Sequence, residues 1–195
     1  MRHEPEPPRS AVLRDGSEVI LRCLDPSDRE RLSDAYDLLS EESRRRRFFS
    51  PPKHLSSRFL DYLTDLDNND RFAWVAFEPS QPDVGLGLAR WVRSKDDPSR
   101  AEPAVAVIDA WQGRGLGTAL LLALIEAAEG RGITTFVAEV LWENDTILDP
   151  LRALGAHVSP AEPGVAMVEF ELPKHLDGSA LHALLSKAAA AGAPS

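Results

Sequence analysis

A glycine-rich segment in the middle of the chain has the composition of an anion-binding loop. The residues Gln112-Gly113-Arg114-Gly115-Leu116-Gly117-Thr118 follow a predicted strand and lead into a long apolar stretch with no capping side chain before it. The first amides of such a helix lack acceptors within the chain, and the helix dipole favours an anion there. Glycine allows positive φ and close backbone approach, while Arg114 adds a cation and Thr118 a hydroxyl. The segment therefore predicts a site for a phosphate-containing ligand. The alternative is a tight strand-to-helix turn whose glycines serve packing alone.

Two other phosphate-binding loops fit these residues less well. A Walker A loop needs Gly-Lys-Ser/Thr after its spacer, and this segment has no lysine. A Rossmann loop reads GxGxxG and follows the first strand of its domain, whereas this segment reads GxGxG and follows several predicted strands. Glu139, in the next predicted strand, could imitate the ribose-binding acid of that fold. Position and spacing nevertheless disfavour both nucleotide hydrolysis and dinucleotide binding.

The charge of the chain argues against a nucleic-acid partner. Its net charge is -9 and its pI is about 5.0, whereas contact with a phosphate backbone needs clustered Lys and Arg. The one basic run, Arg44 to Arg47, could bind an anion, although a charge run at a helix end is more typical of a solvated face. An acidic surface attracts cationic acceptor molecules instead.

The cysteine count and the terminus predict a cytoplasmic protein. Cys23 is the single cysteine and cannot form an internal disulfide, and no Cys/His cluster has the spacing of a zinc site, so no metal is expected. Met1 to Arg9 alternates Pro with charge where a leader would be apolar, and no apolar stretch is long enough to span a bilayer. We therefore expect a reducing compartment and no membrane partner.

Apolar periodicity predicts an alternation of strands and helices around the glycine-rich segment. Strands are expected at residues 17–24, 71–77, 84–93, 104–108, 134–141, 156–158 and 165–172. Helices are expected from a cap at Pro26-Ser27-Asp28 to about residue 40, after Ser40-Glu41-Glu42, and at 55–65, 116–130 and 144–154. This order predicts an α/β (α+β) fold with a partly antiparallel central sheet and helices on both faces. Residues 13–175 would form one domain, between a flexible segment at 1–12 and a helical tail at 176–195.

The segment Ala110-Trp111-Gln112-Gly113-Arg114-Gly115-Leu116-Gly117 resembles the Q/R-x-x-G-x-G/A motif that binds the coenzyme A pyrophosphate in the GNAT superfamily. Other segments, in the same order along about residues 13–158, are similar to the GNAT domain of bacterial protein lysine acetyltransferases. These are Leu13-Arg14-Asp15-Gly16, Ser40-Glu41-Glu42-Ser43-Arg44, Arg47-Phe48-Phe49, Tyr62-Leu63-Thr64-Asp65 and Phe136-Val137-Ala138-Glu139-Val140-Leu141 with Asn144. The resemblance implies a GNAT-like, mostly antiparallel sheet and acetyl-CoA as cosubstrate.

The resemblance also implies a reaction and its residues. A primary amine, on a protein lysine or a small molecule, would attack the acetyl thioester while both substrates are bound. Similar bacterial enzymes place an Ala-Glu before the corresponding strand, which makes Glu102 the candidate general base. Backbone groups of Val107, Ile108 and Asp109 would bind pantetheine and polarise the thioester carbonyl. Asn144 would contact the cofactor arm, or else it caps a helix.

Two residues depart from the family pattern. Pro103 follows Glu102 and could bend the strand and redirect the carboxylate. Many GNAT enzymes have a tyrosine that protonates the leaving thiolate where this chain, counted from Asn144, has Leu151. Pro150 in the same segment predicts a shortened or kinked helix.

Three classes of function stay open at this point. The first is an active N-acetyltransferase, as a monomer or homodimer. The second is a GNAT-like domain that binds an acyl-CoA as a sensor without turnover, which Pro103 and Leu151 motivate. The third is an interaction module, which the glycine-rich segment disfavours.

Overall fold

The computed structural model describes residues 3–173, so the tail expected at 176–195 lies outside the described residues. The chain divides into two compact units. The first holds the residues up to Val92 together with Ala104–Leu124, and the second holds Arg93–Pro103 together with the residues from Ile125. Two strands and one helix therefore contribute residues to both units.

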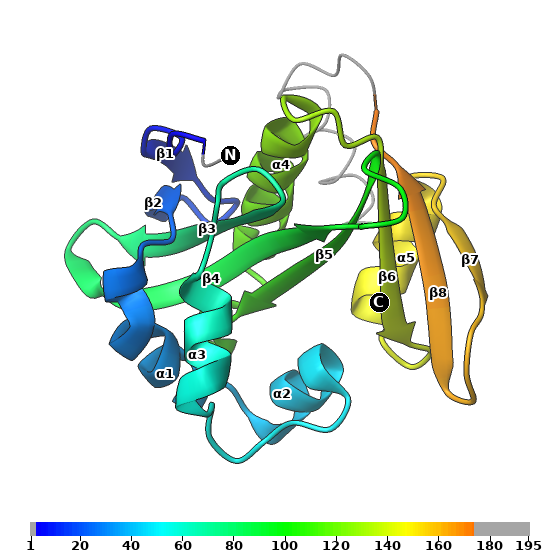
Figure 1. Cartoon of the computed structure of the whole chain (residues 1–195). Coiled ribbons are helices and arrows are strands. Elements are labelled where there is room, and N and C mark those ends of the chain that lie inside the picture. The colour runs from blue at the N-terminus through cyan, green and yellow to red at the C-terminus, as the bar shows by residue number, and fades with distance from the viewer. Residues whose placement is uncertain (1–2, 174–195) are drawn as a thin grey trace. The chain divides into compact units, whose positions relative to one another are not determined.

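The elements alternate largely as the sequence predicts (Figure 1). The strands are β1 (Arg9–Val12), β2 (Glu18–Cys23), β3 (Arg71–Glu78), β4 (Gln81–Arg93), β5 (Arg100–Val107), β6 (Thr135–Leu141), β7 (His157–Pro160) and β8 (Val165–Glu171). The helices are α1 (Arg29–Asp37), α2 (Glu41–Phe48), α3 (Ser57–Thr64), α4 (Leu116–Glu129) and α5 (Asp145–Ala153), with 3-10 turns at Pro26–Asp28 and Asp109–Trp111. Strands pair in the order β1-β2-β3-β4-β5-β6-β8-β7, and β5–β6 is a parallel pair among antiparallel ones. The mixed, mostly antiparallel sheet is confirmed.

In the first unit, helices cover both faces of β3. Ala73, Val75 and Phe77 pack in one cluster with leucines of α1 and α3. On the other face, the Trp74 indole donates a hydrogen bond to the Ala123 carbonyl of α4 at 3.1 Å. Because successive strand residues point to opposite faces, a strand buried along both faces requires this two-sided cover.

A one-residue bulge in β4 interrupts its pairing with β3. Ala76 pairs with Gly87 and Phe77 pairs with Gly85, so Leu86 is the extra residue. An added Cβ at Gly85 would face Ala35 of α1, whereas one at Gly87 would face Leu120 of α4. The bulge therefore turns two glycines that are two residues apart toward opposite faces of the sheet.

Side-chain caps fix the helix starts, with one difference from the sequence prediction. Ser40 and Ser56 cap α2 and α3 by accepting from the amides of Ser43 and Phe59. The expected cap at Pro26-Ser27-Asp28 lies one residue earlier, at Asp25, which accepts from the amide of Ser27. Asp28 is instead a buried carboxylate that reaches back to the Asp25 amide. A proline at the first position fits this arrangement, since it needs no donor there.

Strand β1 and the start of β5 differ from the sequence prediction. Residues 9–12, expected to be flexible, pair with β2 in an antiparallel ladder. Strand β5 begins at Arg100, so Glu102 and Pro103 lie inside it and not before it. Its register with β6 holds only Arg100 with Thr135 and Ala101 with Phe136. Pro103 has no N–H to extend a ladder, which accounts for its place just beyond those pairs.

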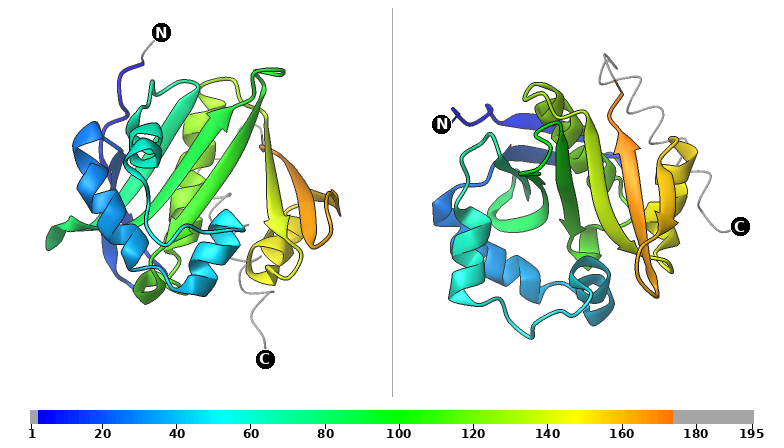
Figure 2. Two further views of the ribbon diagram at one scale, coloured as in Figure 1. Left: turned by 60° about the horizontal axis from the view of Figure 1, so that its bottom comes forward. Right: turned by 45° about the vertical axis from the view of Figure 1, so that its right-hand side comes forward.

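The second unit is built on an antiparallel sheet that α5 covers (Figure 2). Leu148 of α5 is fully buried and clusters with Val140 of β6 and with Ala166 and Val168 of β8. Helix α5 continues through position 150 to Ala153, so the proline that was expected to shorten it lies within the helix.

No helix among residues 3–173 is long and apolar enough to cross a membrane. In the same part of the chain, no three His, Cys, Asp or Glu side chains gather as metal ligands would.

Candidate functional site

The glycine-rich segment forms the turn that starts α4. Gly113 and Gly115 have φ of 73° and 99°, which is backbone that glycine adopts without strain. The first helical hydrogen bond runs from the Ala119 amide to the Gly115 carbonyl at 3.0 Å. No protein oxygen of the described residues accepts from the amides of residues 113–118. These amides, at the positive end of a helix of 14 residues, can bind an anion.

Arg14 braces this turn from the carbonyl side, a contact that the sequence analysis did not predict. Its Nη2 donates to the Gly113 carbonyl at 2.6 Å, and its amide donates to the Arg114 carbonyl at 3.1 Å. The guanidinium of Arg114 lies over the Trp111 ring at 4.7 Å, and its Nε is 3.8 Å from Asp15 Oδ2. The carbonyls of the turn are thus engaged while its amides are not.

The carboxylate of Asp109 ties the first turn of α2 to the glycine-rich segment. It accepts from the Ser40 amide and the Ser43 hydroxyl, both at 2.5 Å, and from Gln112 Nε2 at 2.9 Å. Gln112 Nε2 also lies 3.0 Å from Ser43 Oγ and 3.0 Å from the Val107 carbonyl. Burial raises the pKa of Asp109, but the hydrogen bonds from Ser43, Ser40 and Gln112 outweigh it and lower the pKa overall. The side chains of Asp109 and Gln112 therefore hold the protein's own elements in place, whereas the cofactor contact predicted for Asp109 concerns its backbone.

The backbone of Val107 to Asp109 is partly committed as well. The Ile108 amide donates to the Leu86 carbonyl of β4 at 3.0 Å, and the Ile108 carbonyl accepts from the Trp111 amide at 2.9 Å. The Asp109 amide donates to no protein oxygen of residues 3–173, so it is a donor that a ligand could use.

Glu102 belongs to the second unit and is exposed on β5 between buried Ala101 and half-buried Pro103. Within the described part of the chain its carboxylate makes no hydrogen bond or ion pair. A carboxylate without protein partners is able to accept a proton from a bound amine.

Other predicted residues of the second unit lie around α5. Asn144 is 7% exposed, and its carbonyl accepts from the Ile147 and Leu148 amides, but its side chain caps no amide among the described residues. Leu151 packs against the cluster around Leu148. The position counted for a tyrosine therefore serves packing in this chain.

The basic run in α2 is engaged within the protein. Arg44 lies over the Tyr36 ring at 4.5 Å and donates to the carbonyls of Asp37 and Lys53. Arg45 and Arg46 both pair with Glu42. These contacts fit a solvated helix face better than an anion site.

Comparison with known proteins shows which family this chain is similar to. The Acetyltransferase (GNAT) domain model matches residues 18–157. Acetyltransferase Pat of Mycolicibacterium smegmatis is 36% identical over 166 residues, which are 85% of this chain and 49% of that protein. The chain thus spans about half the length of that relative.

Two further matches cover most of their counterparts. Acetyltransferase PA5475 of Pseudomonas aeruginosa is 31% identical over 73% of this chain and 77% of its own length. The crystal structure of the GNAT domain of S. lividans PAT has a TM-score of 0.78 and 33% identity, and the match covers 85% of this chain and 97% of that one.

Proposed function

The chain belongs to the GNAT acetyltransferase family, and on that premise we propose that it transfers an acetyl group from acetyl-CoA to a primary amine on a protein lysine or a small molecule. The observation that carries the proposal is the row of amides at residues 113–118, which have no acceptor among residues 3–173. A diphosphate supplies the acceptors that such a helix start lacks. Arg14 and the Asp109 network hold the turn in shape from its other side.

In the proposed reaction, Glu102 prepares the amine. A lysine ammonium with a pKa near 10.4 costs about 4 to 5 kcal/mol to deprotonate at pH 7. The Glu102 carboxylate accepts that proton as the amine nitrogen bonds to the acetyl carbon, and the bond from that carbon to sulfur breaks. The Asp109 amide, which donates to no protein oxygen among residues 3–173, is available as a hydrogen-bond donor to the acetyl-CoA.

The thiolate leaves without help from a phenol at position 151, because that position is a leucine that packs against the cluster around Leu148. A thiol's ordinary pKa of about 8.5 lies near neutrality, so the missing acid costs at most about 2 kcal/mol. Solvent can supply that proton.

The composition supports the rest of the proposal. A net charge of -9 favours a cationic acceptor over nucleic acid, and a single cysteine suits a reducing cytoplasm.

A second candidate function is an acyl-CoA sensor without turnover. Leucine at position 151, which has no proton to donate, and the hydrogen bond from the Ile108 amide to Leu86 favour it, because neither residue then assists the chemistry.

The two functions are separated by thiol release from acetyl-CoA in the presence of a panel of amines and lysine-containing proteins. We expect release with the wild type and a fall in kcat of about 10²- to 10⁴-fold for Glu102→Gln, with acetyl-CoA affinity unchanged by calorimetry. Glu171→Gln is the matched control, since Glu171 is another exposed strand glutamate. Binding without thiol release from any acceptor would support the sensor, and absence of binding would refute both.

A further inference from the structure

A cavity of about 70 Å³ lies inside the first unit, between α1, the end of α2 and strands β3 to β5. Its walls are almost entirely apolar, and they include Leu32, Tyr36, Phe48, Val75, Ala106 and Ile108. An engineered cavity of 150 Å³ with similar walls holds benzene. About half that volume has room for about two or three carbon atoms.

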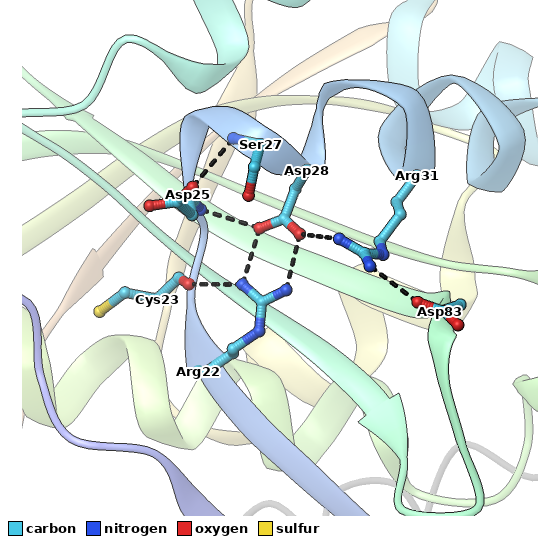
Figure 3. Close-up of polar contacts among 7 residues, drawn as sticks. All are labelled: Arg22, Cys23, Asp25, Ser27, Asp28, Arg31 and Asp83. Atoms are coloured by element: carbon cyan, nitrogen blue, oxygen red, sulfur yellow. Dashed lines mark hydrogen bonds and ion pairs between the residues drawn. The ribbon is translucent and has the colours of Figure 1, made fainter.

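The two charged residues of the lining offer nothing to a polar ligand (Figure 3). Asp28 accepts from both Nη atoms of Arg22 at 2.7 and 2.6 Å, from the Asp25 amide at 2.8 Å and from Arg31 at 3.3 Å. Arg31 turns its other Nη to Asp83 at 2.7 Å. Since a carboxylate has about four acceptor positions, Asp28 is saturated. The cavity therefore selects hydrocarbon.

The order of residues along β5 indicates which hydrocarbon this is. The proposed diphosphate cradle follows β5 within the first unit, and the Asp109 amide, which has no protein acceptor among residues 3–173, comes directly after Ala106 and Ile108 of the cavity wall. A donor bound there can carry its acyl group beside the cavity. Ala106 lines the cavity, whereas the Val107 side chain approaches Gly117 of α4.

We propose that this cavity receives the acyl chain of the donor, so that the chain transfers propionyl and butyryl groups as well as acetyl. The inference rests on the proposed transferase function and specifies its donor class. The step is the same: nitrogen bonds to the acyl carbon, sulfur leaves, and Glu102 takes the amine proton. Each CH₂ buried in the cavity is worth about fourfold in kcat/KM, which corresponds to about 0.8 kcal/mol.

Gly85 allows the cavity to be filled without a clash. An added Cβ would lie 3.7 Å from Ala35 Cβ and 4.0 Å from Val75 Cγ2, both ordinary contacts with cavity-lining residues. Gly85→Ala and Gly85→Val thus add one and three carbons to the cavity. Gly130→Ala is the matched control, because its Cβ would meet only backbone carbonyls of α4 at 3.7 and 3.8 Å.

The experiment compares kcat/KM for acetyl-, propionyl-, butyryl- and hexanoyl-CoA, with calorimetric affinities for the same esters. We expect the butyryl-to-acetyl ratio to fall about fourfold or more in Gly85→Ala and further in Gly85→Val, and to stay unchanged in Gly130→Ala. Hexanoyl-CoA should be poor with every protein, because its chain exceeds the cavity.

Wild-type turnover with acetyl-CoA alone would overturn this inference and leave the transferase proposal standing, whereas no turnover with any ester would refute the transferase. If Gly85→Ala changed the KM of the amine but left the butyryl-to-acetyl ratio of kcat/KM unchanged, the inference would also be overturned. That result would mean that the amine acceptor occupies the cavity.

Discussion

Replacement of Asp28 by Asn tests whether the buried carboxylate holds the start of α1 against β2. Asp28 is 1% exposed and receives a two-pronged hydrogen bond from Arg22, whose side chain is 29% exposed. Asn is the same size, but its NH₂ group would face a guanidinium donor and the charge would be lost. Arg22 would then keep its charge beside an amide that cannot neutralise it.

The size of this effect follows from burial. Breaking a buried ion pair costs about 3 to 5 kcal/mol, and the partial exposure of Arg22 puts the expected loss near 3 kcal/mol. For a chain of this size that is a fall in Tm of roughly 6 to 12 °C. Asp83→Asn is the matched control, because Asp83 pairs with Arg31 in the same chain of charges but is 84% exposed. Exposed pairs contribute about 0 to 1 kcal/mol.

The assay is urea unfolding at pH 7 and at lower pH. Burial raises the pKa of Asp28, but the hydrogen bonds from Arg22 and the Asp25 amide, together with the Arg22 charge, lower it below its usual value. A carboxyl with a lowered pKa stabilises the fold above its unfolded pKa of about 3.9, and this contribution is lost as the pH falls through the folded value. The gap between wild type and Asp28→Asn should therefore shrink in acid. Equal losses for Asp28→Asn and Asp83→Asn at pH 7 would refute the reasoning.

Two further predictions concern the glycine-rich turn. Asp109→Asn should raise the KM for acetyl-CoA several-fold with little change in kcat, because it removes a hydrogen-bond acceptor of the Ser40 amide and loosens the glycine-rich turn. An unchanged KM would show that the hydrogen bonds of Asp109 do not position that turn. Gly115→Ala should weaken coenzyme A binding, measured by calorimetry, more than Gly113→Ala does. Both glycines have positive φ, but only at Gly115 would an added Cβ contact Arg14, at 3.3 Å from its amide nitrogen. Equal losses of affinity in the two variants would exclude that contact as the cause.

Local chemistry made part of this molecule predictable from its sequence. The glycine spacing from Gln112 to Gly117 and the cap Ser40 act within a few residues, so their signals survive without any tertiary context. The long-range contacts do not. Arg14 meets Gly113 across 99 positions and Asp109 meets Ser43 across 66, and nothing local marks either pair.

The misplaced start of β5 has a related cause. Pro103 resembles a strand boundary when only its missing N–H is considered. In the fold, the pairing of β5 with β6 stops at Ala101, so position 103 needs no donor on that side and the strand continues. Likewise β1 is short and polar, and its pairing with β2 defines it more than its own residues do.

The bulge at Leu86 separates two glycines of one strand that differ in their tolerance of a side chain. Gly87 is fixed, since any side chain there would come within 2.9 Å of Leu120 Cδ1 and of the Ala106 carbonyl oxygen. Gly85, turned the other way, has room for a methyl group at ordinary contact distance. During divergence from a common ancestor, substitutions at residue 85 could therefore reshape one face of the sheet, while Gly87 preserves the packing of α4 against the other face.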